Sequence, residues 1–417
     1  MENRVMSVVR ASSLPYLLTI MIAFLIGTYA EYLRHYLGLG VPLIFGQSPL
    51  VYVTALGVAA AAILWFFYQG ERTHEPLLIA FYGLLLLTWV IHWVISRIHG
   101  DGFTYAVLLY GPIVAALLLK TPRKDELLAA LQVLGWGIVV ILVGTRLLEF
   151  AGAIPMLDVG PDFIAFEREN YWLPFAGTLG PESRWHGPFG HAARTGAAAA
   201  FLLALAVGTK NRSRWVFGAV AIVTMLLASS RGSLIAAAAG VALIILFSDN
   251  ILTRRVRRSM LFIGIGIVGL IGLGGVLMRN PTLTGRTTYW QLAIDVWQQS
   301  PLIGSGRGGM QASELAIAGS NAHNILLDVL VKFGLVGAIT AVAALVVAAI
   351  LAVQVARIQV ALPLGILGTY LVLGISEADT EWMAITLPWL WLVLAATLAG
   401  RVRERQPTPV PALSSPQ

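Results

Sequence analysis

Residues 321–356 read NAHNILLDVLVKFGLVGAITAVAALVVAAILAVQVA. The second part of this stretch, from 335 to 356, is apolar and long enough to cross the roughly 30 Å of hydrocarbon in a bilayer as a helix. The first part is more polar and places His323 where a water-exposed loop re-enters the membrane. Because lipid offers an imidazole no hydrogen-bonding partner, this position indicates a functional residue on a membrane scaffold.

The rest of the chain shares this apolar character. Of its 417 residues, 58% are hydrophobic and 12% are charged, and the mean hydropathy is +0.79. These values predict an all-α polytopic membrane protein and exclude an ordinary soluble domain. The chain has no cysteine, which excludes a disulfide framework and a thiolate metal site. About twelve stretches have the length of a membrane span, and they lie at 14–30, 49–68, 76–96, 103–119, 127–150, 192–208, 215–229, 233–248, 259–278, 335–356, 359–375 and 383–399.

Lysine and arginine are concentrated in alternate connections between these stretches. If the N-terminus is cytoplasmic, the short connections on the outer side hold only Arg34, Arg97 and Arg231. This asymmetry follows the positive-inside rule, predicts that both termini are cytoplasmic, and accounts for the net charge of +7 without a nucleic-acid partner. We expect a single membrane domain over 1–406 and a disordered Pro- and Ser-rich tail over 407–417.

Two long connections, 151–191 and 279–323, fall on the predicted outer side. Long ordered loops on a rigid scaffold usually carry function. The second loop places Tyr289, Trp290, Ile294 and Trp297 at helical spacing, which predicts an amphipathic helix in the membrane interface. Such a helix is either an anchor or one wall of a groove for a lipid-linked ligand.

Arginine dominates the basic residues of these outer loops and their edges. A planar guanidinium stays charged and binds two phosphate oxygens at once, so arginine in place of lysine predicts a diphosphate ligand. Structural roles remain open alternatives, namely a membrane-boundary flank, a loop cap or a loop contact. The outer arginines considered for this role are Arg184, Arg194, Arg231, Arg286 and Arg307.

His323 has the chemistry of a general base, because an imidazole with a pKa of about 6 to 7 can accept a hydroxyl proton at neutral pH. An ordinary place in the first turn of a helix is the alternative. Glu377 and Asp379, in the predicted outer connection before the last span, orient His323 or an arginine, bind acceptor hydroxyls, or simply lie in a solvated loop. Asp328 and Lys332 are spaced for a local helical ion pair without a chemical role.

Several strings of the chain resemble one known superfamily. His323-Asn324, nine residues, Gly334, two residues and Gly337 resemble the signature of the O-antigen ligases and polymerases. Segments 230–234, 285–290 and 301–306 are similar to other motifs of that superfamily. The resemblance covers about 184–340 by motif and the whole chain by its predicted spans and large outer loops.

This resemblance implies a GT-C-like glycosyltransferase that needs neither metal nor cofactor. It would transfer a glycan, with inversion, from undecaprenyl diphosphate to an acceptor on the periplasmic face of a bacterial inner membrane. The implied roles are a base for His323 and diphosphate binding for Arg231, Arg286 and Arg184, although the spacing from Arg184 to Gly196 departs from a pattern of some polymerases. Supporting roles are implied for Asn324, Arg307, Glu377 and Asp379.

The resemblance leaves the acceptor open. A ligase would use a lipid A core sugar or a similar acceptor, whereas a polymerase would use another lipid-linked glycan, and a protein side chain is a third acceptor. From other classes, a solute transporter also fits about twelve spans, and a non-catalytic scaffold of envelope assembly leaves the arginine and histidine set unexplained. The clustering of ionisable residues in outer loops favours the enzyme over the transporter.

Overall fold

The computed structural model describes residues 71–100, 111–152 except 112, 113 and 116, 185, 187–189, 192–209, 211–228, 230–248, 286–306, 324–356, 360–376 and 387–404. Their regular structure is helical, apart from an isolated antiparallel bridge between Glu71 and Thr121. The α-helices are α4 (Pro76–Ile98), α6 (Lys124–Phe150), α8 (Ala192–Gly208), α9 (Ser213–Ala228), α10 (Arg231–Phe247), α12 (Arg286–Gln299), α15 (Ile325–Ala356), α16 (Leu362–Ser376) and α17 (Leu387–Glu404). A short 3-10 helix, η1 (Gly187–Phe189), precedes α8.

Apart from α12, the described α-helices match predicted spans in position. Helices α4, α6 and α15 are long and apolar enough to cross a membrane, and α8, α9, α10 and α16 contain shorter apolar segments. The chain is thus a mostly helical, multi-pass membrane protein. Helix α15 begins at Ile325, before the predicted start of its span at 335. The predicted spans 14–30, 49–68 and 259–278 and the tail 407–417 lie outside the described residues, so the total of about twelve stays a prediction.

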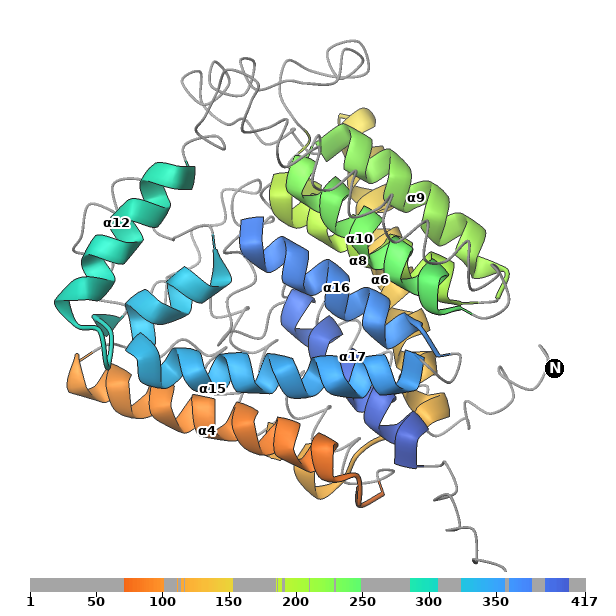
Figure 1. Cartoon of the computed structure of the whole chain (residues 1–417). Coiled ribbons are helices and arrows are strands. Elements are labelled where there is room, and N and C mark those ends of the chain that lie inside the picture. Colours follow the sequence, from red (N-terminus) through yellow and green to blue (C-terminus); the bar gives the residue numbers. More distant parts are fainter. Residues whose placement is uncertain are drawn as a thin grey trace, which may run out of the picture.

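The helices form one bundle around a common apolar core (Figure 1). Helix α4 lies along α15 on one flank, while α8 contacts α9, α10 and α16. Large aromatic side chains fill the centre, where the rings of Phe201 and Trp391 stack with their centroids 5.5 Å apart. This core fixes the directions of the helices, and those directions decide which loop ends meet.

Helices α10 and α16 are antiparallel and pack through small residues. A Cβ added to Gly240 would lie 2.0 Å from Oγ1 of Thr369, and one added to Gly365 would lie 2.3 Å from Cγ1 of Ile244. Gly240 pairs with Thr369 and the later residue Ile244 pairs with the earlier residue Gly365, so the two helices run in opposite directions. Glycine is required here because the two backbones approach more closely than any side chain allows, as is common between membrane helices. The first turn of α10 therefore lies beside the last turn of α16.

Helices α8 and α10 run in the same direction. A Cβ on Gly196, in the second turn of α8, would lie 2.6 Å from Oγ of Ser233 and 2.8 Å from Cβ of Ser230. At the other end of α8, a Cβ on Gly208 would lie 2.5 Å from Cδ1 of Leu362, the first residue of α16. The starts of α8 and α10 and the end of α16 consequently occupy one end of the bundle, which we call the loop end.

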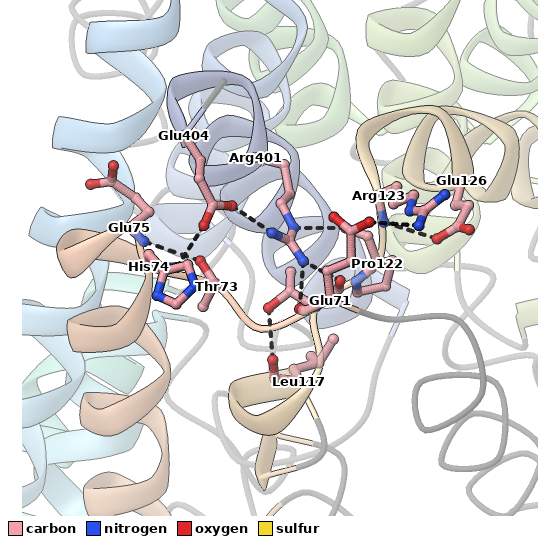
Figure 2. Close-up of polar contacts among 11 residues, drawn as sticks. Glu71, Thr73, His74, Glu75, Leu117, Pro122, Arg123, Glu126, Arg401 and Glu404 are labelled. Atoms are coloured by element: carbon pink, nitrogen blue, oxygen red, sulfur yellow. Dashed lines mark hydrogen bonds and ion pairs between the residues drawn. The ribbon is translucent and has the colours of Figure 1, made fainter. Parts of the chain in front are cut away.

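The opposite end is fastened by Arg401, near the end of α17 (Figure 2). Its side chain is buried, and Nε donates to the carbonyl of Pro122 at 3.0 Å. Nη2 donates to the carbonyls of Glu71, at 2.6 Å, and Thr121, while Nη1 forms an ion pair with Glu404. One guanidinium thus joins α17 to the segments that lead into α4 and α6.

Further charged residues add contacts between α17 and its neighbours at this end of the bundle. Oε1 of Glu404 accepts a hydrogen bond from the backbone N of His74 at 2.6 Å, and Nη1 of Arg403 lies 3.2 Å from Oε1 of Glu75 and donates to Gln354. These segments flank connections that the sequence assigns to the cytoplasm. Their meeting at one end agrees with the predicted alternation of connections.

Candidate active site

Helix α15 begins where the His-Asn string ends. The Oδ1 atom of Asn324 accepts hydrogen bonds from the backbone N of Leu326 at 3.0 Å and of Leu327 at 3.2 Å. Asn324 therefore caps the helix and satisfies donors that a helix start leaves open. His323, the preceding residue in the sequence, lies outside the described residues, so its role as a base stays a prediction.

The other half of the Asn324 amide joins α15 to α16. Nδ2 donates to the carbonyl of Ile375 at 3.3 Å, in the last turn of α16. Serine or aspartate at this position would supply the cap acceptor but no amide N–H for this second bond. The asparagine therefore fixes the start of α15 to the end of α16 at the loop end of the bundle.

Helix α15 is interrupted at Gly334, where φ is 61° and ψ is −164°. The turn that follows α12 pairs with the backbone around this break. The N of Leu335 donates to the carbonyl of Pro301 at 2.9 Å, and the N of Ser305 donates to the carbonyl of Val331 at 2.8 Å. Backbone groups freed by an interruption need such partners within a membrane, because lipid offers none.

Two glycines make this backbone contact possible. A Cβ on Gly334 would lie 2.3 Å from the carbonyl C and O of Leu302, and one on Gly304, where φ is 73°, would lie 2.6 Å from C of Lys332 and N of Phe333. Side chains at either position would separate the two segments. Gly304 of the 301–306 string and Gly334 of the His-Asn signature therefore take part in the same backbone contact.

The second glycine of the signature makes room for an aromatic contact. A Cβ on Gly337 would lie 2.3 Å from Cβ of Phe333, whose ring centroid is 4.2 Å from that of buried His92 on α4. Gly337 thus supports the packing of α4 on α15.

The predicted ion pair between Asp328 and Lys332 is confirmed, with Nζ 2.7 Å from Oδ2. Both side chains are buried, which the spacing did not predict. A buried pair contributes little net stability because desolvation offsets the attraction, but removal of one partner leaves a costly unpaired charge. The pair lies between the Asn324 cap and the break at Gly334, within the segment that follows His323 in the sequence.

Helix α12 begins at Arg286 and confirms the predicted helix in the second long loop. Ala293 and Val296 are buried against Val331 of α15, and Nε1 of Trp297 donates to the carbonyl of Pro301 at 3.0 Å. The C-terminal end of α12 is therefore held at the break in α15, and Arg286 occupies the end of α12 away from the break (Figure 1).

The Ser-Arg-Gly string starts helix α10. Ser230 is the N-cap, and its Oγ lies 2.8 Å from Oγ of Ser233, which also donates to the carbonyl of Ala193 at 3.4 Å. Arg231 is the first residue of α10. This serine pair fixes the start of α10 to the first turn of α8.

These contacts bring the starts of several helices to the loop end. The first turn of α10, with Arg231, lies beside the last turn of α16, to which Asn324 fixes the start of α15. Helix starts carry a partial positive charge and favour anions. Within the described residues, no three His, Asp or Glu side chains group as metal ligands. The other predicted site residues outside the description are Arg184, Arg307, Glu377 and Asp379.

A buried polar contact at the loop end was not among the predicted site residues. Nε1 of Trp185 donates to Oε2 of Glu149 at 2.8 Å, and Nη1 of Arg146 lies 3.2 Å from the same oxygen. The available signal in the sequence was a glutamate and an arginine within an otherwise apolar span. The tryptophan partner, 36 positions away, had no such signal.

Comparisons with known proteins identify the relatives of this arrangement. Residues 197–342 match the family described as O-Antigen ligase. The chain is also 25% identical, over 335 residues, to the Exopolysaccharide production protein ExoQ of Rhizobium meliloti (strain 1021), and this match covers 70% of the chain and 75% of the relative. Both findings confirm the resemblance to the O-antigen ligase and polymerase superfamily that the motifs predicted.

Proposed function

We propose that this multi-pass membrane protein, similar to the O-antigen ligase and polymerase superfamily, is a ligase-type glycosyltransferase. Its donor is a glycan on undecaprenyl diphosphate, and its acceptor is a hydroxyl of lipid A core or of a similar glycan, lipid or protein. The reaction takes place at the loop end of the bundle, on the periplasmic face of a bacterial inner membrane, with both termini in the cytoplasm. No metal or cofactor is needed.

The proposed reaction is a single inverting displacement. The acceptor oxygen attacks the anomeric carbon as the bond from that carbon to the diphosphate oxygen breaks. The imidazole of His323 takes the hydroxyl proton, and the undecaprenyl diphosphate leaves with the bonding electron pair. Arg231, Arg286 and Arg184 stabilise the negative charge that grows on the diphosphate, which is the electrostatic role that fixed guanidinium groups perform best.

The observation that best supports this proposal is the hydrogen bond from the side chain of Asn324 to the carbonyl of Ile375. This bond fixes the start of α15, one residue after His323 in the sequence, to the last turn of α16. Because α16 is antiparallel to α10, Arg231 begins a helix at the same end. The arrangement supports a site in which a base and an anion-binding arginine act on one substrate. The break at Gly334 holds the C-terminal end of α12, and Arg286 begins the same helix at its other end.

The test is glycan transfer by the purified full chain in lipid nanodiscs, with a lipid-linked oligosaccharide as donor. His323→Ala is expected to lower kcat by about 10²- to 10⁴-fold, the usual effect of losing a general base. Arg231→Lys and Arg286→Lys are expected to raise the KM for the donor and lower kcat, because lysine keeps the charge but loses the planar fork.

Exposed residues near the end of α4 provide the matched controls. His99→Ala and Arg97→Lys change the same residue types at exposed positions and are expected to leave transfer unchanged. Transfer by His323→Ala at the parental rate would refute the base assignment. Parental kinetics in both lysine variants would refute the diphosphate assignment.

A polymerase is the second candidate, and the similarity to a protein named for exopolysaccharide production favours it. Both activities use the same donor and differ in the acceptor. With lipid-linked glycan alone, a polymerase yields a ladder of longer lipid-linked chains. A ligase yields no ladder until lipid A core or another separate acceptor is added.

A further inference from the structure

We infer that Trp185 and Glu149 are positioning residues for Arg231, one of the arginines proposed to bind the diphosphate. The inference rests on the function proposed above and extends its site to two residues that are not expected to touch substrate. Their contact joins α6 to the last turn of α9 at the loop end, and α9 is followed in the sequence by α10.

Trp185 connects α6 to α9 through two separate hydrogen bonds. Its backbone N donates to the carbonyl of Leu227 at 3.0 Å, in the last turn of α9. Its indole Nε1 donates to Oε2 of Glu149 at 2.8 Å, in the last turn of α6. With 5% of its surface exposed, Trp185 is held on both its backbone and its side chain. Position 185 therefore has a defined place between α6 and α9.

Burying the carboxylate of Glu149 at this position costs desolvation free energy. Its side chain is only 2% exposed, and it lies in α6, a helix long and apolar enough to cross a membrane. Its Oε2 accepts from Trp185 and pairs with Arg146 at 3.2 Å, while the Arg146 guanidinium lies 5.9 Å from the indole centroid. An apolar side chain would avoid the desolvation of this charge. Ionisable groups that are retained in a membrane helix usually serve function.

A series of contacts links the segment that contains Trp185 to the start of α10. Two residues after Trp185, Gly187 has a φ of 59°, and a Cβ there would lie 2.9 Å from Oγ1 of Thr195 on α8. Gly196, the residue after Thr195 on α8, in turn packs against Ser230, the N-cap of α10. Leu227, the backbone partner of Trp185, precedes that cap by only three positions in the sequence.

The two links have one consequence for the proposed site. A shift of Trp185 would move the starts of α8 and α10 together, and with them the backbone of Arg231, the first residue of α10. Arg184, which precedes Trp185 in the sequence, lies outside the described residues. Loss of the contact should therefore weaken recognition of the diphosphate in the donor. The chemistry proposed for His323, which precedes α15 in the sequence, should be much less affected.

Donor kinetics of the full chain in nanodiscs test this assignment. Trp185→Phe keeps an aromatic ring but removes the N–H donor, and we expect a rise of at least ~5-fold in the KM for lipid-linked glycan with kcat within about twofold, the pattern of lost substrate binding. Trp215→Phe is the matched control, because Trp215 is 72% exposed, and it should leave both constants unchanged.

Two changes at Glu149 test the hydrogen bond independently of Trp185→Phe. Glu149→Asp keeps the charge but withdraws the acceptor by one methylene group, and it should raise the KM. Glu149→Gln keeps the reach and a carbonyl acceptor for the indole, and it should retain a KM close to the parental value. A merely structural role predicts instead that the two variants follow their thermal stabilities, with no division between KM and kcat.

Binding of undecaprenyl diphosphate without a glycan separates the possible failures. The parent should bind it, and Trp185→Phe and Glu149→Asp should bind it more weakly by the same factor as their rise in KM. Parental affinity in both variants would overturn the positioning role while leaving the proposed function intact. A parent that neither binds undecaprenyl diphosphate nor transfers glycan would refute the proposed function and this inference with it.

Discussion

Replacing Gly334 by alanine should break the joint between α15 and the turn after α12. The φ of 61° and ψ of −164° at Gly334 belong to a region that is essentially restricted to glycine. An alanine Cβ would also lie 2.3 Å from the carbonyl C and O of Leu302 and 2.5 Å from N of Ile303. Because these are backbone atoms, no side-chain rotation relieves the contact, and the two segments must separate.

The expected loss in the free energy of unfolding of Gly334→Ala has two parts. Forcing alanine into this backbone conformation costs about 1–3 kcal/mol. Separation also breaks the hydrogen bonds from N of Leu335 to O of Pro301, at 2.9 Å, and from N of Val336 to O of Leu302, at 3.2 Å. Each such bond contributes about 0.5–1.5 kcal/mol net, so the two parts together give about 2–6 kcal/mol.

The assay is reversible unfolding of the purified protein in mixed micelles, together with glycan transfer. Gly334→Ala is expected to lower the free energy of unfolding by the amount above and to lower transfer, because the segment that starts with Asn324 loses its fixed end. Gly83→Ala on α4 and Gly144→Ala on α6 are matched controls, since a Cβ at either position meets nothing within 4 Å. A Gly334→Ala protein as stable as these controls would refute the account of the joint.

Three further substitutions test other contacts by the same unfolding measurement. Asn324→Asp keeps the helix cap but loses the N–H that binds Ile375, so it should be less destabilising than Asn324→Ala, which also loses a cap worth about 0.5–2 kcal/mol; equal stability of the two variants would contradict the double role. Arg401→Met leaves buried carbonyls without their donor and should cost about 3–5 kcal/mol, and a cost below about 1 kcal/mol would show that the fastening in Figure 2 is dispensable. Gly240→Ala overpacks the contact with Thr369 and should cost about 1–3 kcal/mol; Thr369→Ala in the same chain should restore part of this loss, and purely additive effects would contradict the contact.

The helix content could be predicted from the sequence because the bilayer imposes length and hydropathy on every span. The predicted spans 192–208 and 335–356 correspond to α8 and to the part of α15 after the break. The helix of the second long loop and the ion pair of Asp328 with Lys332 were likewise predictable, since both depend on spacing within a few turns. The superfamily resemblance also required only short strings, and the comparisons confirm it.

Contacts between segments that are distant in the sequence could not be predicted from local composition and spacing. The motif predicted that Asn324 supports the site, but its bond to Ile375 joins residues 51 positions apart. Trp185 and Glu149 meet only because α6 and α9 end at the same place. The sequence alone determined which segments are apolar enough to cross a membrane and which residue types could recognise a diphosphate, because those properties depend on local composition. Tertiary structure alone decided which helix ends meet and why Gly334 must be glycine, because close backbone approach is a property of pairs of segments that no local pattern encodes.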